Sequence, residues 1–314
     1  MALSRMKKIA WVVGVLFIMA NLVAYQHAYK FTHFTGHATR TRDPKALPVL
    51  SKIGLLFTGI DNPHPQNKAL PTQPYKVVKI KSTTTLHCWQ IDTPGSKGTV
   101  VMFHGFAGEK SSLLTRADVF IQQGYRVFLV DFMGSGGSEG NKTSIGFTEA
   151  EQVKDCFNYI QSQSEKHIIL FGTSMGSAAV LKAMKDNPSV NPAGIVLECP
   201  FGSLYRTVAA RFKLMGVPAF PMAGLLCFWG GVQNGYWAFG HNPIDYASAV
   251  KCPTLLLFGE QDDRVSREET DALFANLKGP KTLKAYPQAG HNVFSDTNQQ
   301  TWIADVTGFV AMLP

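Results

Sequence analysis

Ser174 stands within Gly172–Gly176, whose sequence G-T-S-M-G joins an apolar run to helix-forming residues. A serine on so tight a strand-to-helix turn needs small neighbours two positions away. The turn exposes the hydroxyl beside a helix N-terminus, whose dipole favours developing negative charge. A glycine-rich helix cap can give the same five letters, but the strand-to-helix context favours a nucleophile that attacks carbonyl carbon.

Backbone N–H groups near such a serine must hold the oxyanion of a tetrahedral intermediate. The sequence H-G-F-A-G at His104–Gly108 follows another apolar run and supplies a loop of this kind. We expect the N–H of Met175 and that of Phe106 to form the oxyanion hole, with Ala107 as the alternative to Phe106. His104 is expected to brace this loop as a buried imidazole.

A third motif is the sequence D-F-M-G-S-G-G-S at Asp131–Ser138. It is similar to the D-x-x-G-x-G-x-S loop of a branch of the α/β-hydrolase superfamily that also carries an H-G-F loop. Over roughly residues 75–314 the chain resembles this superfamily, most closely its serine aminopeptidase-like and prolyl-oligopeptidase-like branch. The resemblance implies an α/β-hydrolase fold and a catalytic triad in the chain order serine, acid, histidine.

The acid and the base of that triad should follow two late strands. Gly259–Val265 is similar to the family's G-x-x-D-x-x-V, a register that selects Asp262. Asp263 is expected to be a solvated loop carboxylate. Of the nine histidines, His291 alone lies in the loop after the next strand. Asp262 would then orient the imidazole of His291, the base for Ser174.

No cofactor and no metal are expected. Gly134–Gly137 lacks both the G-K-[ST] of a P-loop and the G-x-G-x-x-G helix start of a dinucleotide site, and Asp131 before it is expected to hold a turn. The cysteines show neither C-x-x-C spacing nor histidine partners at metal-like intervals, so we expect buried thiols ahead of a disulfide. These cysteines are Cys88, Cys156, Cys199, Cys227 and Cys252.

Short apolar strands alternate with longer helical patterns from residue 75 onward, which predicts a mostly parallel sheet with helices on both faces. Ligands bind at the carboxyl ends of the strands in such sheets, where all the motifs fall. The expected strands are Tyr75–Ile80, Leu86–Ile91, Thr99–Phe103, Arg126–Val130, His167–Phe171, Gly194–Leu197, Thr254–Phe258 and Thr282–Ala285. The expected helices are Ser111–Gln123, Thr148–Gln163, Met175–Asp186, Arg267–Leu277 and Thr297–Leu313.

The N-terminus has the pattern of a membrane segment. Arg5, Lys7 and Lys8 precede Ile9–Tyr25, a run of 17 residues without a charge. This length is at the short end for a transmembrane helix, and no A-x-A cleavage site follows it. We expect residues 1–28 to be an uncleaved signal anchor, with a cleaved signal as the alternative. Residues 29–74 would connect it to the hydrolase domain, with a short helix at Val49–Phe57.

The net charge of +8 is concentrated at the N-terminal end. Residues 1–100 hold 13 Lys and Arg against 3 Asp and Glu, whereas residues 101–314 hold 17 against 19. This division favours membrane topology over a nucleic-acid surface. The early positive charges favour a cytoplasmic N-terminus and an exported catalytic domain, either membrane-anchored or secreted after cleavage.

A cap insertion is expected at about residues 200–250, before the strand that carries the acid. Its centre, Leu214–Gly240, is 27 residues long and uncharged. We expect an apolar acyl pocket there, with Phe228 and Trp229 as substrate-binding residues; simple packing onto the sheet is the alternative. A second membrane span is disfavoured because two prolines and six glycines interrupt the run.

The predicted function is a serine hydrolase that cleaves a carboxylic ester or thioester through an acyl-enzyme, acting on a small or lipid-like substrate. A serine peptidase that cleaves amides is the alternative, disfavoured because the expected pocket region has almost no acidic residue to hold an amine. A non-catalytic binding protein on the same fold is a further alternative. The sequence leaves the substrate and the oligomeric state open.

Overall fold

The computed structural model describes residues 2–36, 48, 54–55, 59–295 and 297–313. Most of the Val49–Phe57 stretch, where a helix was expected, lies outside these residues. The chain forms two compact units. Unit 1 comprises Met1–Pro63 with Leu204–Gly240, and unit 2 comprises His64–Ser203 with His241–Pro314.

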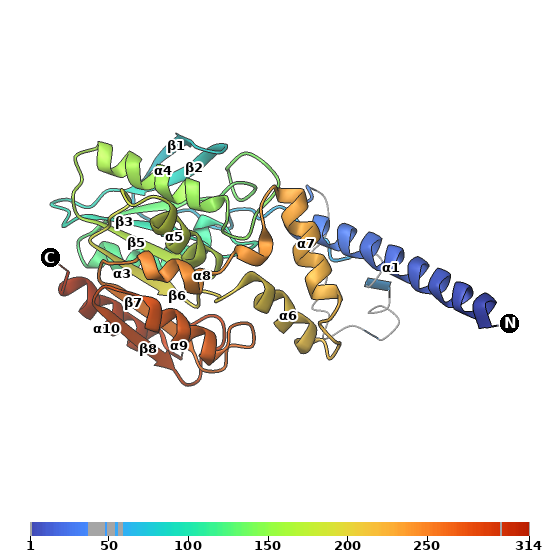
Figure 1. Cartoon of the computed structure of the whole chain (residues 1–314). Helices are drawn as coiled ribbons and strands as arrows, with labels where there is room; N and C mark the ends of the chain where they lie inside the picture. The colour runs from blue at the N-terminus through green and yellow to red at the C-terminus, as the bar shows by residue number, and fades with distance from the viewer. Residues whose placement is uncertain (1, 37–47, 49–53, 56–58, 296, 314) are drawn as a thin grey trace. The chain divides into compact units, whose positions relative to one another are not determined.

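Unit 2 is built on one eight-stranded sheet in the order β1-β2-β4-β3-β5-β6-β7-β8 (Figure 1). The first two strands pair antiparallel, and β2 pairs antiparallel with β4, while all later neighbours are parallel. The strands are β1 Lys76–Lys81, β2 Thr85–Ile91, β3 Thr99–Phe103, β4 Arg126–Val130, β5 Ile168–Thr173, β6 Gly194–Glu198, β7 Thr254–Gly259 and β8 Lys281–Tyr286. Every predicted strand is present, and the mixed, mostly parallel sheet confirms the predicted fold class.

Successive side chains of a strand point to opposite faces of the sheet, so a wholly apolar strand makes both faces apolar. Helices cover both of these faces. Val101 and Phe103 of β3 belong to one buried cluster, and Val100 and Met102 belong to the other. The first face packs against α4 (Glu149–Ser162), α5 (Met175–Asp186), α8 (Pro243–Tyr246), α9 (Arg267–Asn276) and the short turn Ala247–Ala249. The second packs against α3 (Leu114–Gln122), which follows the short turn Lys110–Leu113, and α10 (Gln299–Ala311).

The start of α9 fixes the end of the loop that follows β7. Ser266 caps the helix, since its hydroxyl accepts from the N–H of Glu269 at 3.2 Å. The Glu269 carboxylate accepts in return from the N–H of Ser266 at 3.3 Å. This capping box satisfies two backbone donors that a helix start would otherwise leave unpaired.

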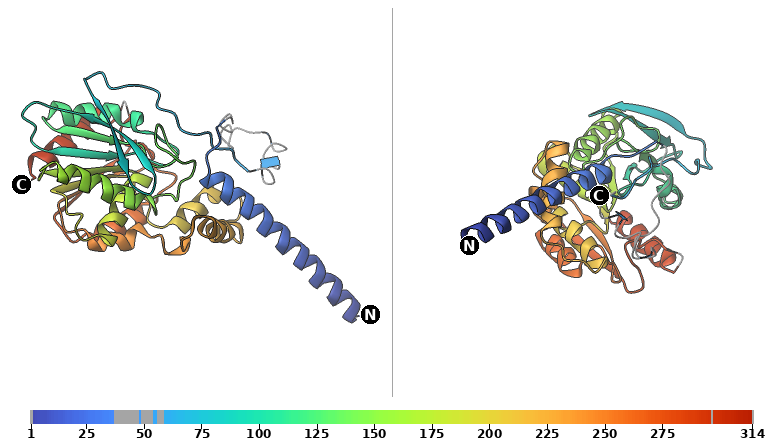
Figure 2. Two further views of the ribbon diagram at one scale, coloured as in Figure 1. Left: turned by 90° about the horizontal axis from the view of Figure 1, so that it is seen from above. Right: turned by 90° about the vertical axis from the view of Figure 1, so that its right-hand side faces the viewer.

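Unit 1 contains α1 (Ala2–Thr32), α6 (Leu204–Leu214), α7 (Met222–Asn234) and the short turn Ala238–Gly240. Helix α1 therefore continues past the predicted boundary at residue 28. Its C-terminal half packs along α7, while its N-terminal half extends away from that helix (Figure 2). Within the described residues, α1 is the one helix long and apolar enough to cross a membrane, and the mean hydropathy of its most apolar 18 residues is 1.9.

Candidate active site

The turn that carries Ser174 joins β5 to α5. Ser174 has a φ of 49° and a ψ of −107°, a strained conformation of the kind found at functional sites. A side chain at Gly172 would lie 2.5 Å from the nitrogen of Ser177, and one at Gly176 would lie 2.3 Å from the carbonyl oxygen of Phe103. Both glycines of the G-x-S-x-G motif are therefore required by the space around the turn.

Ser174, His291 and Asp262 come together beyond the carboxyl ends of β5, β7 and β8. The Ser174 hydroxyl lies 2.9 Å from Nε2 of His291. Nδ1 of His291 lies 2.7 Å from Oδ2 of Asp262. Because an ionised carboxylate can only accept, Nδ1 carries the proton and Nε2 is left to accept from the serine hydroxyl. The geometry is that of a nucleophile, a base and an orienting acid.

Asp262 is held as a carboxylate. Burial raises the pKa of its carboxyl, but the hydrogen bond and charge of His291 and the N–H groups of Arg264 and Val265 outweigh burial, so the pKa lies below its ordinary value. Those two N–H groups donate to Oδ1 at 2.8 and 3.1 Å. Asp263, the neighbouring carboxylate, is half exposed and lies 4.0 Å from the Arg264 guanidinium. The structure therefore brings Asp262, and not Asp263, to the imidazole.

Cys199, the residue after β6, adds a buried thiol to this group. Its Sγ, the Asp262 carboxylate and the His291 ring lie within 4.8 Å of one another. Metals bind the thiolate, whereas burial and the charge of Asp262 raise the pKa of the Cys199 thiol well above its ordinary value. The other two side chains already bond each other, so hydrogen bonding around the acid suits this cluster better than a metal.

The loop after β3 passes beside the nucleophile. A side chain at Gly105 would lie 3.6 Å from Cβ of Ser174, so the backbone that leads into Phe106 is next to the serine. Met175, the first residue of α5, is buried directly after Ser174. The two N–H groups predicted to face an oxyanion thus belong to segments that flank the nucleophile on either side.

His104 links this loop to the loop after β4. Its Nε2 accepts from the N–H of Phe132 at 3.1 Å, so Nδ1 is the protonated nitrogen and donates to the carbonyl of Gly105 at 2.8 Å. Complete burial lowers the pKa of His104 and keeps the ring neutral. The predicted bracing role fits these contacts.

Asp131 joins three segments of unit 2 beneath the same loop. Its carboxylate accepts from the N–H of Lys110 at 2.8 Å, from the side-chain amide of Asn67 at 2.9 Å and from the N–H of Gly137 at 2.8 Å. It also forms a fully buried ion pair with the ammonium of Lys110, which contacts Nδ1 of His87 at 3.0 Å. Asp131 is therefore saturated by structural partners.

A second buried charge network supports the loop of His291, and sequence reasoning missed it. Nε of Arg116 donates to both carboxylate oxygens of Glu198 at 3.0 and 3.1 Å. The same guanidinium donates to the side chain of Asn292, the residue after His291, at 2.9 Å. The indole of Trp302 donates to Glu198 at 2.7 Å. The sequence pointed to this network in one way only: Glu198 ends the otherwise apolar strand β6 at the carboxyl edge of the sheet.

Phe228 and Trp229, the predicted substrate-binding residues, lie on α7 in unit 1. Phe228 borders an open apolar groove with Val232 and Trp237. Trp229 packs against α1, where its ring meets that of Tyr25 edge-on with centroids 5.3 Å apart. Sequence reasoning did not foresee this contact between two distant segments.

The fold and the arrangement of Ser174, His291 and Asp262 are those of an α/β-hydrolase. Comparison with family models agrees: residues 94–228 match the model described as serine aminopeptidase, S33. Residues 240–313 match a second model, described as PhoPQ-activated pathogenicity-related protein. The chain thus has the α/β-hydrolase fold, and its residues 94–228 resemble the serine aminopeptidase S33 family.

Related proteins share about a quarter of their residues with this chain. Rv2307c of Mycobacterium tuberculosis is 27% identical over 271 residues, which cover 79% of this chain and 89% of that protein. WAV2 of Arabidopsis thaliana, described as an alpha/beta hydrolase domain-containing protein, is 26% identical over 79% of this chain and 80% of its own. YqkD of Bacillus subtilis is 24% identical over a region that covers 70% of this chain and 72% of that protein.

Solved structures with the same fold include esterases. The Pyrococcus furiosus esterase Pf2001 superposes with a TM-score of 0.64 at 21% identity, covering 79% of this chain and 97% of its own. Est1E from Butyrivibrio proteoclasticus, solved with ferulic acid bound, superposes with a TM-score of 0.60 at 17% identity. The superposition covers 75% of this chain and 98% of Est1E. At this level of identity the likeness supports the fold.

Proposed function

We propose that this protein is a serine hydrolase that cleaves a carboxylic ester or thioester through an acyl-enzyme on Ser174. The observation that carries the proposal is the unbroken pair of hydrogen bonds from Ser174 to His291 and from His291 to Asp262. The esterases among the structural neighbours support the same class of substrate.

The first half of the reaction transfers the acyl group to the serine. Nε2 of His291 takes the hydroxyl proton as the Ser174 oxygen attacks the carbonyl carbon. The imidazolium that forms is stabilised by the Asp262 carboxylate, whose lowered pKa keeps it charged. His291 then gives the proton to the leaving alcohol or thiol, and the acyl-enzyme remains.

The second half repeats these steps with water. His291 removes a proton from the water that attacks the acyl-enzyme, and returns it to Ser174 as the acid departs. In both halves the N–H groups of Met175 and Phe106 would hold the oxyanion. Loss of one such donor in comparable enzymes slows turnover by about 10²–10³-fold.

An ester suits the site better than a peptide with a free N-terminus. An amine would need an acidic side chain near the nucleophile that is free to pair with it. The buried carboxylates Glu198, Asp131 and Glu149 are committed to Arg116, to Lys110 and to the hydroxyls of Thr143 and Ser144. Phe228 and Trp229 are proposed as contacts for the acyl chain, which fits an apolar ester.

The full chain in detergent should be assayed with p-nitrophenyl esters of graded acyl length beside aminoacyl and peptidyl p-nitroanilides. Ser174→Ala serves as the matched control for background hydrolysis. We expect kcat/KM to be higher for the esters than for any amide, and to rise with acyl length as about 0.8 kcal/mol is gained for each CH₂ buried. A higher kcat/KM for the aminoacyl amides would establish the peptidase instead.

A further inference from the structure

The basic charge of the protein belongs to unit 1. The two stretches of unit 1 hold eleven Lys and Arg against two Asp and Glu, whereas unit 2 holds nineteen against twenty. Helix α6 carries Arg206, Arg211 and Lys213 and no acidic residue, and the 27 residues that begin at Leu214 carry no charge at all. A basic helix followed directly by an uncharged apolar one is the composition of a segment that lies on an anionic membrane.

Helix α7 is joined firmly to the C-terminal half of α1. The indole of Trp229 donates to the side-chain oxygen of Asn21 at 3.0 Å. The side-chain amide of Gln233 donates to the carbonyl of Tyr25 at 2.8 Å. A side chain at Gly230 would lie 3.9 Å from Cβ of Ala28, so small residues let the two backbones approach, as in helix pairs within membranes.

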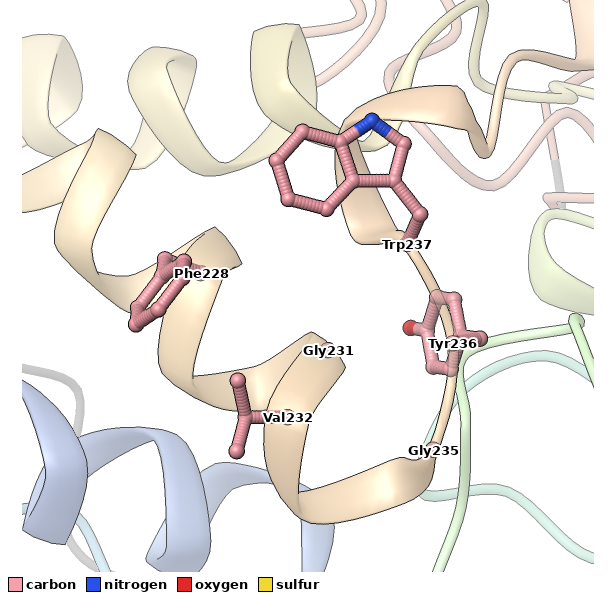
Figure 3. Close-up of a pocket in the computed structure, with 6 residues that line it drawn as sticks. All are labelled: Phe228, Gly231, Val232, Gly235, Tyr236 and Trp237. Carbon is pink, nitrogen blue, oxygen red and sulfur yellow. The ribbon is translucent and has the colours of Figure 1, made fainter.

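The side of α7 away from α1 is apolar and open. Phe228 and Val232 border a groove of about 290 Å³ whose opposite wall is Tyr236 and Trp237 (Figure 3). Val232 is 55% exposed and Trp237 is 65% exposed. Further exposed apolar side chains flank the helix on its N-terminal side, at Met215, Val217 and Phe220.

A second apolar groove makes this surface continuous with the candidate membrane span. It is lined by Trp229 of α7 and, on α1, by Phe17, Ile18, Leu22, Tyr25 and the polar Asn21. The exposed apolar side chains of α1 continue from there toward the N-terminus, including Leu16, Val13 and Trp11. Exposed apolar side chains are therefore found on both α1 and α7, with Trp229 and α1 forming a groove between the two helices.

The contacts place α7 at a defined depth along α1. The uncharged run Ile9–Tyr25 is about 26 Å long at about 1.5 Å per residue, slightly less than the thickness of about 30 Å of a hydrocarbon core. The hydrogen bonds between α1 and α7 begin at Asn21, near the end of that run. Tyr25 and Tyr29 then stand at the level where aromatic residues gather in membrane proteins.

We propose that α7 and its flanking segments lie in the interface of an anionic lipid bilayer, at the C-terminal end of the span formed by α1. Phe220, Val232 and Trp237 would contact acyl chains, while Arg206 and Lys213 on α6 would contact anionic headgroups. The inference rests on unit 1 alone and holds whatever reaction Ser174 catalyses.

Quenching of tryptophan emission by brominated acyl chains tests the proposal. The full chain is reconstituted into vesicles of phosphatidylcholine and phosphatidylglycerol, with and without bromine near the middle of the acyl chains. Trp237→Phe is compared with Trp302→Phe, which alters a tryptophan buried in unit 2, and with Trp11→Phe in the span. Removing a quenched tryptophan lowers the quenched fraction of the remaining emission, and removing a shielded one raises it.

We expect the quenched fraction to fall in Trp237→Phe and Trp11→Phe and to rise in Trp302→Phe. Val232→Asp, which places a charge on the same face, should lower the quenched fraction while the tryptophans stay in place. A rise in Trp237→Phe would overturn the proposal; cross-linked dimers abolished by Val232→Asp would then identify a second copy as the occupant. An unchanged quenched fraction in Trp11→Phe would overturn it as well, because α1 would not be in the bilayer.

The headgroup contact has its own test. Quenching of the wild-type chain is measured in phosphatidylcholine alone and in the mixture with phosphatidylglycerol, at low and high salt. We expect more quenching in the anionic vesicles, a difference that high salt and the double variant Arg206→Gln, Lys213→Gln both remove. Equal quenching in the two lipids would remove α6 from the proposal.

Discussion

Arg116 and Glu198 form a buried ion pair beside the loop of His291, in which the Nε–H of Arg116 is shared between both carboxylate oxygens at 3.0 and 3.1 Å. The same guanidinium reaches Asn292 at 2.9 Å. Since Asn292 directly follows His291, the pair connects the end of β6 to the loop that holds the base. The backbone carbonyl of Glu198 also accepts from the N–H of Ser174 at 2.7 Å. One buried residue thus contacts the turn of the nucleophile and, through Arg116, the loop of the base.

Asn292→Ala should lower kcat by about tenfold or more with little change in Tm, because it frees the His291 loop without leaving a buried charge unpaired. Arg116→Ala should instead lower stability by about 3–5 kcal/mol, since Glu198 would remain buried and ionised without its partner. Thermal unfolding and ester turnover separate the two effects. Asn276→Ala, which loses a side-chain hydrogen bond to the carbonyl of Ile244, is the matched control and should keep normal kcat.

Asp262→Asn should lower kcat by about 10⁴-fold, because the amide would favour the wrong tautomer of His291. Asp263→Asn is the matched control one position away, and its half-exposed side chain predicts turnover within about twofold of wild type. Both variants should fold normally. If only Asp263→Asn lost activity, the assignment of Asp262 as the acid would be wrong.

Stability should fall in mild acid because of His241. Burial lowers the pKa of His241 to about 4, whereas in the unfolded chain it is about 6.5. Between these values the unfolded chain binds a proton that the folded chain does not, so stability decreases as pH falls. The full difference amounts to about 3 kcal/mol. Denaturant unfolding of His241→Gln at pH 7.5 and pH 5 should show a smaller loss than wild type; equal losses would contradict the assignment.

The sequence predicted the sheet and the site because both depend on local patterns. Strands β3 to β7 are buried on both faces, and their apolar runs ended where charged, glycine or proline residues began. The two glycines of the G-x-S-x-G motif are needed because a side chain at Gly172 or Gly176 would collide with neighbouring backbone atoms. Asp262 and His291, the candidate acid and base, were selected by their order and by their loops, which a parallel sheet brings to one edge.

What the sequence did not predict depends on contacts between distant segments. The cap at about residues 200–250 stays a prediction, but the sequence did not predict that Leu204–Gly240 would group with α1 in unit 1. The spacing of apolar residues in a sequence does not predict a side-chain hydrogen bond such as that between Trp229 and Asn21, which are 208 positions apart. The pairing of Arg116 with Glu198 is likewise a tertiary contact, made across 82 positions.

The full chain should remain in the membrane fraction after carbonate extraction, at the mass of the uncleaved protein. Cleavage after residue 28 would remove the buried Ala24 and Ala28, and with them the contact between Ala28 and Gly230 of α7. An uncleaved anchor therefore stays our prediction, with a removed signal as the alternative. Intact mass of the fractionated protein is the measurement, and a soluble mature chain that lacks the first 24 to 28 residues would contradict this account.

Labelling with a fluorophosphonate tests the central claim most directly, because the probe reacts with a serine only when a base activates it. The full-length protein, shown to be folded by circular dichroism, is incubated with the probe, and its intact mass and modified peptide are determined. We expect one adduct, on Ser174, which is absent in Ser174→Ala and formed far more slowly in His291→Ala. Folded wild-type protein that stays unlabelled, or that is labelled on another serine, would contradict the assignment of Ser174 as the nucleophile.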